Sequence, residues 1–435
     1  MNQHAPPSIA PVSPRSIAEL DLPATMLQDL LLKTMFRRSL TRVSEMAEAM
    51  HIPVPLTQEL VDTARQLKLV EALGSLTSEG SEEMRFALAD HGKARALDAL
   101  TQSEYYGAVP VPLEHFAEQT KRQSIKNVTL TPETLGQSME HLVLPKGLLQ
   151  QLGPAVTSGR SVLLYGPPGN GKSSISNGIR DAMGDHVYVP HAISYGGQII
   201  TVFDPVVHTP VTPPAQTVSR LRRATTHDKR YVCCRRPAVI TGGELELAML
   251  DLVYNPVART YAAPLQLKAT GGIFIVDDLG RQAEPPQALI NRWIVPMEAG
   301  YDILALQSGE KFVVPFDTLV IFSTNFHPNE IFDNAALRRV FFKLKIDGPT
   351  KEEFLKIFGL VAKAKKMPLD ETSLIHLMSR KYPEVDHVYA NFHANFLIDQ
   401  MIAVCDYEGI PRQMTPDLID RAWSNLYVDD AEIAH

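Results

Sequence analysis

Cysteine is scarce in this sequence, and its three cysteines are poorly spaced for a metal site or a disulfide framework. Cys233 and Cys234 are neighbours, and Cys405 lies far from both. Zinc sites and disulfide-stabilised domains need several cysteines at recurring separations. The sequence therefore suggests neither class, and its cysteine usage fits a reducing cytoplasm.

Long apolar runs and an excess of basic charge are also missing. No stretch approaches the roughly 18 apolar residues of a membrane-spanning helix, and the N-terminus lacks a basic segment followed by an apolar one. Forty-nine acidic and 42 basic residues give a net charge of −7, which provides no general attraction to nucleic acid or to an anionic membrane. We therefore expect a cytoplasmic protein without membrane insertion, in which DNA contact would need a local basic patch.

The chain is long enough for several domains. Its 435 residues, 45% of them hydrophobic, can form two to four domains of ordinary size. Residues 1–21 carry Pro6, Pro7, Pro11 and Pro14 among serine and alanine. Because this composition offers little apolar surface to bury, we expect a disordered tail there.

Residues 22–104 show the periodicities of short helices and strands. The pattern predicts helices over 26–36, 41–50 and 55–69, then strands over 70–73 and 84–88 around a polar tip, and a last helix over 90–100. Three helices followed by a hairpin resemble a winged helix-turn-helix domain. Residues 105–130 are expected to form a connector that contains a short helix around 113–123.

The charges of this region bear on DNA binding, which is common among winged helices. The exposed positions of the third predicted helix carry charges that cancel: Glu59, Asp62, Arg65 and Lys68. The hairpin tip carries three acids, which a phosphate backbone would repel: Glu79, Glu82 and Glu83. We therefore favour a module for protein contacts or regulation, and DNA binding is the alternative.

A glycine-rich motif dominates the rest of the chain. The apolar run 161–165 is followed by Gly-Pro-Pro-Gly-Asn-Gly-Lys-Ser and then by a predicted helix. This order and spacing are typical of a phosphate-binding loop, in which glycines turn backbone N–H groups toward the phosphates at a helix N-terminus. We predict that Lys172 reaches the β- and γ-phosphates of ATP and that the Ser173 hydroxyl binds Mg²⁺. The predicted nucleotide-binding residues are Gly166, Pro167, Pro168, Gly169, Asn170, Gly171, Lys172, Ser173 and Ser174.

Polar residues end two further apolar strands. The run Ile-Phe-Ile-Val ends in Asp277 and Asp278, as in a strand buried on both faces whose terminal acid holds Mg²⁺. We assign the metal to Asp277 and the orientation of the attacking water to Asp278. The strand 318–324 ends at Asn325, which is placed to hydrogen-bond that water or the γ-phosphate.

Two arginines close a short predicted helix. Arg338 and Arg339 follow Asn334-Ala-Ala-Leu and precede another strand. They are either solvated charges that interact favourably with the helix dipole, or arginine fingers that reach the γ-phosphate of a nucleotide bound to a neighbouring subunit.

The stretches GPPGNGKS, IFIVDD, VIFSTN and ALRR, in this order, resemble the Walker A, Walker B, sensor 1 and arginine-finger elements of AAA+ ATPases. The resemblance covers residues 131–427. It implies an α/β P-loop NTPase domain with a central parallel sheet over 131–347 and a helical lid over 348–435. It also implies hydrolysis of ATP with Mg²⁺ and assembly into a ring, expected to be a hexamer, that remodels a protein client.

The residues on either side of the Walker B-like stretch IFIVDD refine this resemblance. Residues 263–272 and 285–298, with a strand pair over 301–306 and 310–315, resemble MoxR-type chaperones and bacterial enhancer-binding proteins. An N-terminal winged helix joined to such a core resembles a group of bacterial AAA+ ATPases. Residues 195–262 form an insertion. Its Tyr195 is either a pore residue that grips a client or an ordinary turn tyrosine. Its basic run, from Arg220 to Arg236, is a solvated face, an intersubunit contact or a polyanion site.

Two departures from the AAA+ pattern affect the expected chemistry. Asp278 stands where the family usually has glutamate, and Asn395 stands where a lid arginine is expected. We therefore predict slow hydrolysis, with a slowly hydrolysing ATP switch as an alternative, and we assign no residue to the lid arginine's role.

Overall fold

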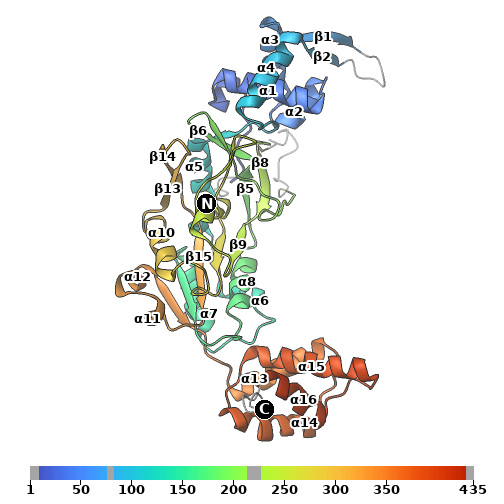
Figure 1. Ribbon diagram of the computed structural model, residues 1–435, viewed down its shortest axis with the longest axis vertical. Coiled ribbons are helices and arrows are strands. Elements are labelled where there is room, and N and C mark those ends of the chain that lie inside the picture. The colour runs from blue at the N-terminus through green and yellow to red at the C-terminus, as the bar shows by residue number, and fades with distance from the viewer. Residues whose placement is uncertain (1–8, 76–82, 129, 213–226, 428–435) are drawn as a thin grey trace, which may run out of the picture. The chain divides into compact units, whose positions relative to one another are not determined.

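The computed structural model describes residues 9–75, 83–128, 130–212 and 227–427 (Figure 1). In these ranges every helix is too short or too polar to cross a membrane. The chain divides into two compact units. Unit 1 comprises residues 1–128, 183–274 and 288–319, and unit 2 comprises residues 129–182, 275–287 and 320–435.

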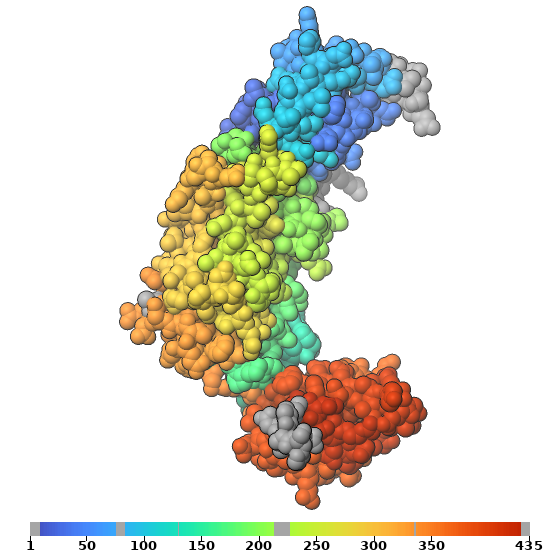
Figure 2. Space-filling model, viewed as in Figure 1, coloured from blue at the N-terminus to red at the C-terminus, as the bar shows by residue number. Residues whose placement is uncertain are grey.

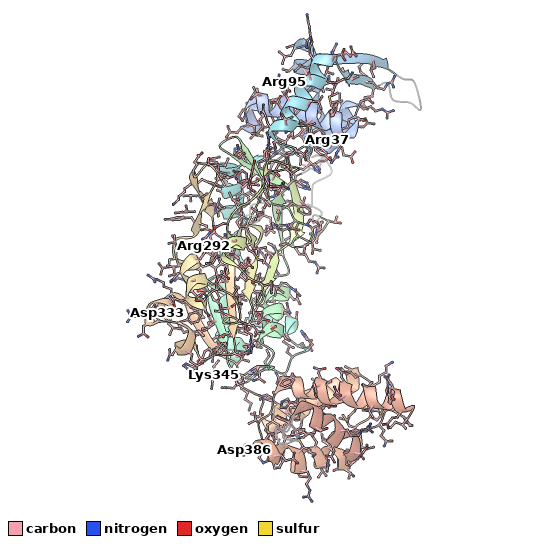
Figure 3. The ribbon with its side chains drawn as sticks, in the orientation of Figure 1. Arg37, Arg95, Arg292, Asp333, Lys345 and Asp386 are labelled. Atoms are coloured by element: carbon pink, nitrogen blue, oxygen red, sulfur yellow. The ribbon has the colours of Figure 1, made fainter. Side chains whose placement is uncertain are left out.

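The first part of unit 1 follows the predicted order of elements. Helices α1 (Ala24–Arg38), α2 (Val43–Met50) and α3 (Val54–Gln66) precede strands β1 (Val70–Ser75) and β2 (Met84–Leu88) and helix α4 (Asp90–Gln102). The strands are antiparallel, with Val70 opposite Leu88. Apolar side chains from all four helices form a shared core. Arg95 of α4, labelled in Figure 3, is paired with Asp29 of α1. The predicted tip residues Glu79 and Glu82 lie outside the described residues.

The expectation of a disordered tail is wrong for residues 9–21. The Gln119 amide donates to the Ile9 carbonyl at 2.7 Å, and Val12 forms a β-bridge with His227. Ser16 caps the short helix η1 (Ile17–Leu20), and Leu20 is fully buried in the core of α1 to α4. Ile9 and Ala10 pack against a small core that contains Val111 and Tyr188, whereas Val12 stays exposed. The composition of the segment alone does not reveal these contacts.

The middle of unit 1 is a β-rich body around α5 (Leu113–Arg122), with the short η2 (Ile125–Asn127) after it. One five-stranded sheet has the order β10-β11-β7-β6-β3, and β5 pairs with β8 in antiparallel fashion. The strands are β3 (Val111–Pro112), β5 (His186–Pro190), β6 (Ala192–Tyr195), β7 (Gln198–Thr201), β8 (Tyr231–Arg235), β10 (Val253–Asn255) and β11 (Thr260–Ala262). The predicted insertion is thus largely built as part of this β-rich body.

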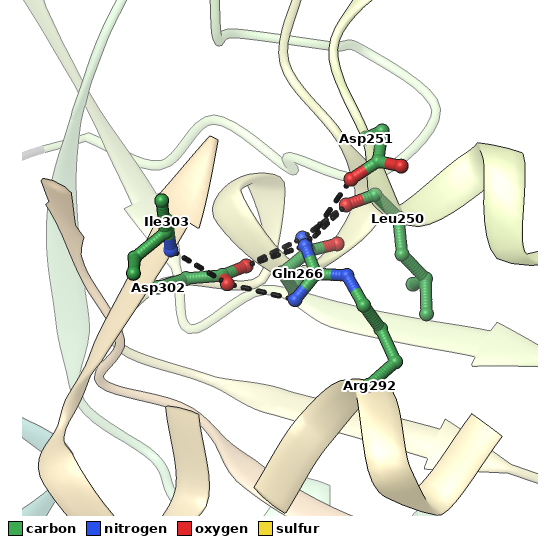
Figure 4. A network of polar contacts seen from close by, with 6 residues as sticks. All are labelled: Leu250, Asp251, Gln266, Arg292, Asp302 and Ile303. Atoms are coloured by element: carbon green, nitrogen blue, oxygen red, sulfur yellow. Dashed lines mark hydrogen bonds and ion pairs between the residues drawn. The ribbon is translucent and has the colours of Figure 1, made fainter. Parts of the chain in front are cut away.

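A polar network joins the last elements of unit 1. Helix α10 (Pro286–Ala299) is followed by the antiparallel hairpin β13 (Tyr301–Ala305) and β14 (Lys311–Pro315), the predicted strand pair. Arg292 of α10 makes two bonds, of 2.7 and 3.0 Å, to the buried carboxylate of Asp302 (Figure 4). The same guanidinium donates to the carbonyl of Leu250, which ends η3 (Leu247–Leu250), and Gln266 of α9 (Leu265–Lys268) donates to Asp302 at 3.0 Å. The network fixes the hairpin to the helix before it.

A second five-stranded sheet has the order β16-β4-β15-β12-β9, the central sheet of the fold. Strands β15 and β16 both lie parallel to β4. The strands are β4 (Val162–Tyr165), β9 (Ala238–Thr241), β12 (Ile273–Val276), β15 (Leu319–Thr324) and β16 (Phe342–Lys345), and the helices of this part are α6 (Pro132–Ser138), α7 (Leu148–Thr157), α8 (Lys172–Ala182), α11 (Pro328–Ile331) and α12 (Asn334–Arg339). The predicted α/β P-loop NTPase fold class is confirmed.

The C-terminal helices of unit 2 pack into one compact body, drawn in red in Figure 2. They are α13 (Lys351–Ala364), α14 (Glu371–His376), the turns η4 (Leu377–Lys381) and η5 (Tyr382–Val385), α15 (Asn391–Glu408) and α16 (Pro416–Leu426). Phe354, Phe358, Tyr382 and Trp423 lie at their centre. The π-helical turn η4 directly follows α14.

Candidate functional site

The glycine motif forms a tight loop between β4 and α8. Val162, Leu163 and Leu164 are fully buried, as expected for a central strand of a parallel sheet. The loop turns through positive φ angles at Gly166, Gly169 and Gly171. At Gly166 a side chain would also meet the Ile346 carbonyl oxygen, because a Cβ there would lie 2.2 Å from it. Glycine is therefore required for both the backbone angles and the space.

Lys172, the first residue of α8, is buried beneath this loop. Its Nζ donates to the carbonyls of Gly166 and Pro167 at 2.9 Å and to Oδ1 of Asn325 at 2.8 Å. Burial lowers the pKa of Lys172, while the nearby Asp277 and Asp278 carboxylates raise it. A cation, inward-turned glycines and the N-terminus of an 11-residue helix together make a site for a polyphosphate anion.

The two predicted metal ligands are in direct contact. Ser173, at the start of α8, donates its hydroxyl proton to Oδ2 of Asp277, which follows β12, and the two oxygens are 2.5 Å apart. Hydroxyl and carboxylate oxygens are the ligands that Mg²⁺ prefers in proteins. Because both side chains also lie beside the loop that would hold phosphates, the donor set fits a magnesium ion bound together with a nucleotide.

Asn325 connects the loop lysine to the second acid. It follows β15, accepts from Lys172 through Oδ1, and donates through Nδ2 to Oδ1 of Asp278 at 3.1 Å. Asp278 has a positive φ of 49°, an uncommon conformation for any residue but glycine. Lys172, Asn325 and Asp278 lie after three different strands, β4, β15 and β12. The fold brings them together at one edge of the sheet, as expected for parallel strands.

The two predicted arginine fingers lie at the end of α12. This helix is capped by Asp333 (Figure 3), whose side chain accepts from the Ala336 N–H at 2.7 Å. Arg338 and Arg339 are both exposed to solvent. An exposed position leaves them accessible to another molecule, and their assignment to a neighbouring subunit's site stays a prediction.

A cavity of about 300 Å³ adjoins the loop, and the sequence did not predict most of the residues that line it. One wall is the segment 141–145, another is the loop itself with Ser174 and Ile175, and the third comes from α13 and the start of α15. Its surface combines apolar side chains such as Leu144 and Leu360 with the amides of Asn391 and Asn395. No motif marks these residues, because their shared role arises only when distant segments fold together.

The start of α15 makes direct contact with the glycine loop. The Phe392 N–H donates to the Gly169 carbonyl at 3.0 Å, and the Asn391 side chain donates to the Asn170 carbonyl at 3.1 Å. The Phe392 ring covers Gly169 so closely that a Cβ there would lie 2.1 Å from the ring. The C-terminal helices therefore contact the loop through its backbone.

The insertion residues singled out by sequence are engaged within unit 1. Tyr195 stacks on Phe312 with ring centroids 4.3 Å apart and donates its hydroxyl proton to Glu310 at 3.1 Å. These contacts favour the ordinary turn tyrosine over a free pore residue. In the basic run, Arg230 and Arg236 are buried and paired with Asp228 and Asp185, respectively, so neither is available to a polyanion. Three further residues of this run lie outside the described residues: Arg220, Arg222 and Arg223.

Comparison with known proteins gives a partial match to one family. A family model described as "Domain of unknown function (DUF8689)" matches residues 350–425, which are the C-terminal helices. No curated protein matches the sequence at a significant level.

Several solved structures resemble the chain at low sequence identity. A point mutant of Thermotoga maritima RuvB is 14% identical, with a TM-score of 0.36 over 71% of this chain and 74% of that one. NtrX from Brucella abortus is 12% identical, with a TM-score of 0.38 over 76% of this chain and 62% of that one. The T. maritima structure titled "RuvB Holliday junction branch migration motor" is 15% identical, with a TM-score of 0.32 over 74% of each chain. With scores this low, the functional argument depends on the geometry of this chain itself.

Proposed function

We propose that this protein is an AAA+ ATPase that binds ATP with Mg²⁺, hydrolyses it, and acts as a ring oligomer to remodel a protein partner. The observation that carries the proposal is the contact of Lys172 with Asn325 and of Asn325 with Asp278, beside the Ser173–Asp277 pair. Phosphate-binding, metal-binding and water-orienting groups are thus within contact distance of one another.

The triphosphate would lie in the glycine loop. The N–H groups of the loop and of the first turn of α8 would donate to its oxygens, and Lys172 would exchange its bonds to Gly166, Pro167 and Asn325 for bonds to phosphate. Ser173 and Asp277 would hold Mg²⁺, which supplies charge neutralisation for the phosphates when it is bound. The cavity beside the loop, with apolar walls from 141–145 and α13, offers a place for the nucleobase.

Asp278 and Asn325 would act on the attacking water. Asp278 accepts a proton as the water oxygen forms its bond to the γ-phosphorus, and the bond from that phosphorus to the β–γ bridging oxygen breaks to give ADP and phosphate. Asn325 holds the Asp278 carboxylate and, once Lys172 has turned to the phosphates, offers Oδ1 to the water or the γ-phosphate. Aspartate is one methylene shorter than glutamate, so slow turnover remains our expectation.

The other regions have roles that follow from their contacts. The C-terminal helices would serve as a lid that moves with the nucleotide state, because the start of α15 is bonded to Gly169 and Asn170. Arg338 and Arg339 would reach the γ-phosphate on a neighbouring subunit. The assignment of the arginines makes each hydrolytic site depend on two subunits of the ring.

The N-terminal helices and hairpin would form a winged helix used for protein contacts. Glu83 accepts from both the backbone N–H and the hydroxyl of Ser44 at 2.8 Å, at the start of α2. These donors would otherwise be available to a DNA phosphate. Leu67, Leu73 and Met84 are exposed nearby, which supports a protein partner over DNA.

The proposal is tested by steady-state ATP hydrolysis across a protein concentration series, with mass photometry on the same samples. We expect Mg²⁺-dependent turnover that rises per subunit as the higher oligomer forms and that is lost in Lys172→Ala. Tight ATP binding with negligible turnover at every concentration would favour the switch instead. Failure of the wild-type protein to bind ATP more tightly than Lys172→Ala would overturn the proposal.

A further inference from the structure

The turn that follows β12 is held by a glutamine side chain. Gln282 is buried, with 9% of its surface exposed. Its Oε1 accepts from the Gly280 N–H at 2.9 Å, and its Nε2 lies 3.4 Å from the carbonyl oxygens of both Asp277 and Asp278. One amide therefore bonds to the backbone of three of the four residues from 277 to 280.

The other side of the same turn is bonded to β15. The Leu279 N–H donates to the Ser323 carbonyl at 2.7 Å, and the Thr324 hydroxyl donates to the Leu279 carbonyl at 2.7 Å. Gly280, with a φ of 108°, lies against the Phe326 ring, where a Cβ would be 2.9 Å from a ring carbon. The turn is thus fixed between β15 and Gln282.

This fixation matters because Asp278 lies within the turn in a left-handed conformation. A φ of 49° is uncommon outside glycine, and aspartate adopts it where local hydrogen bonds hold the turn. In this conformation its carboxylate reaches Asn325 at 3.1 Å. A turn that relaxed toward a negative φ would redirect this short side chain away from Asn325.

We propose that Gln282 is a positioning residue for the hydrolytic site. Its amide holds the left-handed turn and thereby keeps the Asp278 carboxylate at Asn325, where it can orient the attacking water. Gln282 itself contacts the backbone of the turn and is assigned no contact with nucleotide or water. The inference rests on the proposed ATPase function and adds a residue that none of the sequence motifs includes.

The test compares Gln282→Met with the wild-type full-length protein in steady-state hydrolysis. Methionine matches the length of glutamine but lacks its hydrogen bonds. We expect kcat to fall about tenfold to a hundredfold, because small misplacements of a reacting group have effects of this size, while KM and ATP binding measured without Mg²⁺ change by less than about twofold. The matched control is Gln400→Met, which removes a glutamine bonded to Asn425 in the C-terminal helices and should leave both parameters unchanged.

A second variant separates positioning from general support of the fold. Gln282→Glu keeps an acceptor for Gly280 and loses the donor to the two carbonyls unless the new carboxyl is protonated. Burial raises the pKa of such a carboxyl, so its activity relative to wild type should recover as the pH falls from 8 to 6. Because the same protonation would also relieve a destabilised fold, circular dichroism at each pH must show the variant to be folded for the recovery to report on positioning.

A double-mutant cycle identifies the group through which Gln282 acts. In an Asp278→Asn background, which tolerates the left-handed conformation but has no carboxylate, Gln282→Met should cause little further loss of kcat. An unchanged kcat in Gln282→Met alone, or an equal loss in both backgrounds, would overturn the inference. The proposed function fails separately, if the wild-type protein hydrolyses ATP no faster than Lys172→Ala.

Discussion

At the scale of single residues, glycines determine how closely the chain can approach itself. Gly166 and Gly169 both combine a positive φ with a neighbouring group that leaves no room for a Cβ. The neighbour of Gly166 is the backbone of Ile346, whereas the neighbour of Gly169 is the movable ring of Phe392. The first contact holds the loop against Ile346, the residue after β16. The second is one that movement of the C-terminal helices can break.

Gly169→Ala should therefore weaken ATP binding by about tenfold or more, because the new Cβ meets the Phe392 ring and the φ of 75° is strained for alanine. Isothermal titration calorimetry measures the affinity. The control is Gly153→Ala in α7, where a Cβ would meet open space. Adding Phe392→Ala to Gly169→Ala should restore part of the affinity, and no restoration would show that backbone strain alone is responsible.

For Lys172, the role was predictable from the sequence, but the contacts were not. The spacing of the motif predicted its role, but its three bonds to Gly166, Pro167 and Asn325 depend on the folded loop. A lysine that already has three acceptors must exchange them for phosphate oxygens. Binding of a nucleotide would thereby release Asn325 from one of its two partners.

At the scale of elements, the bounds of helices and strands followed the sequence closely. Strand β2 has the predicted bounds, Met84 to Leu88, and α2 (Val43–Met50) lies within the predicted helix over 41–50. The β13–β14 hairpin was also predicted, and it alternates buried and exposed residues along both strands. Local patterns succeed here because each of these elements has one face in a core.

The attachment of that hairpin to α10 was not predictable from local pattern. Asp302 is 2% exposed and would be an expensive buried charge without Arg292, which lies ten residues before it. An arginine and an aspartate at this separation have no characteristic signature. Only the packing of α9, α10 and η3 around them makes the pair necessary.

Arg292→Met should destabilise unit 1 by about 3 kcal/mol, because it leaves the buried Asp302 carboxylate without its cation. The two tryptophans make the measurement specific, since Trp293 lies in α10 and Trp423 in α16. Urea unfolding followed by fluorescence in a Trp423→Phe background reports on unit 1.

The matched control for Arg292→Met is Arg122→Met, which removes an exposed ion pair with Glu118 and should change stability by less than about 1 kcal/mol. Equal effects of the two substitutions would contradict a special role for the buried pair.

At the scale of the whole molecule, the proposed ring requires that two subunits complete one site. Phosphate, metal and water-orienting residues lie together in unit 2, whereas Arg338 and Arg339 are exposed at the end of α12. If those arginines act on a neighbour, a subunit with a disabled site still carries working arginines. A mixture of subunits with complementary defects should then recover ATP hydrolysis.

Mixing Lys172→Ala with an Arg338→Ala, Arg339→Ala double variant should therefore give more ATP hydrolysis than the sum of the two separate samples. The Lys172→Ala subunit supplies arginines to the intact site of its neighbour. The control mixture replaces the Lys172→Ala subunit with a triple variant in which Lys172, Arg338 and Arg339 are all alanine. This variant can supply no arginine to the site of its neighbour. If mass photometry shows mixed oligomers but no recovered activity, the arginines do not act between subunits.

The sequence by itself determined the fold class, the order of the elements and the candidate residues of the site. It could do so because phosphate binding requires glycines, a lysine and a hydroxyl at fixed spacing, and because buried parallel strands are recognisable as apolar runs. Asp277, Asp278 and Asn325 were also predicted as candidates, since they lie within two residues of the end of such a strand.

Only the tertiary structure decided which distant groups meet. The packing of residues 9–21 on unit 1, the cavity beside the loop, the Arg292–Asp302 pair and the support of Asp278 by Gln282 all escaped prediction. The sequence motifs reflect local chemistry that repeats at fixed spacing. These other features arise from side chains meeting after the chain has folded, and their spacing in the sequence carries no such constraint.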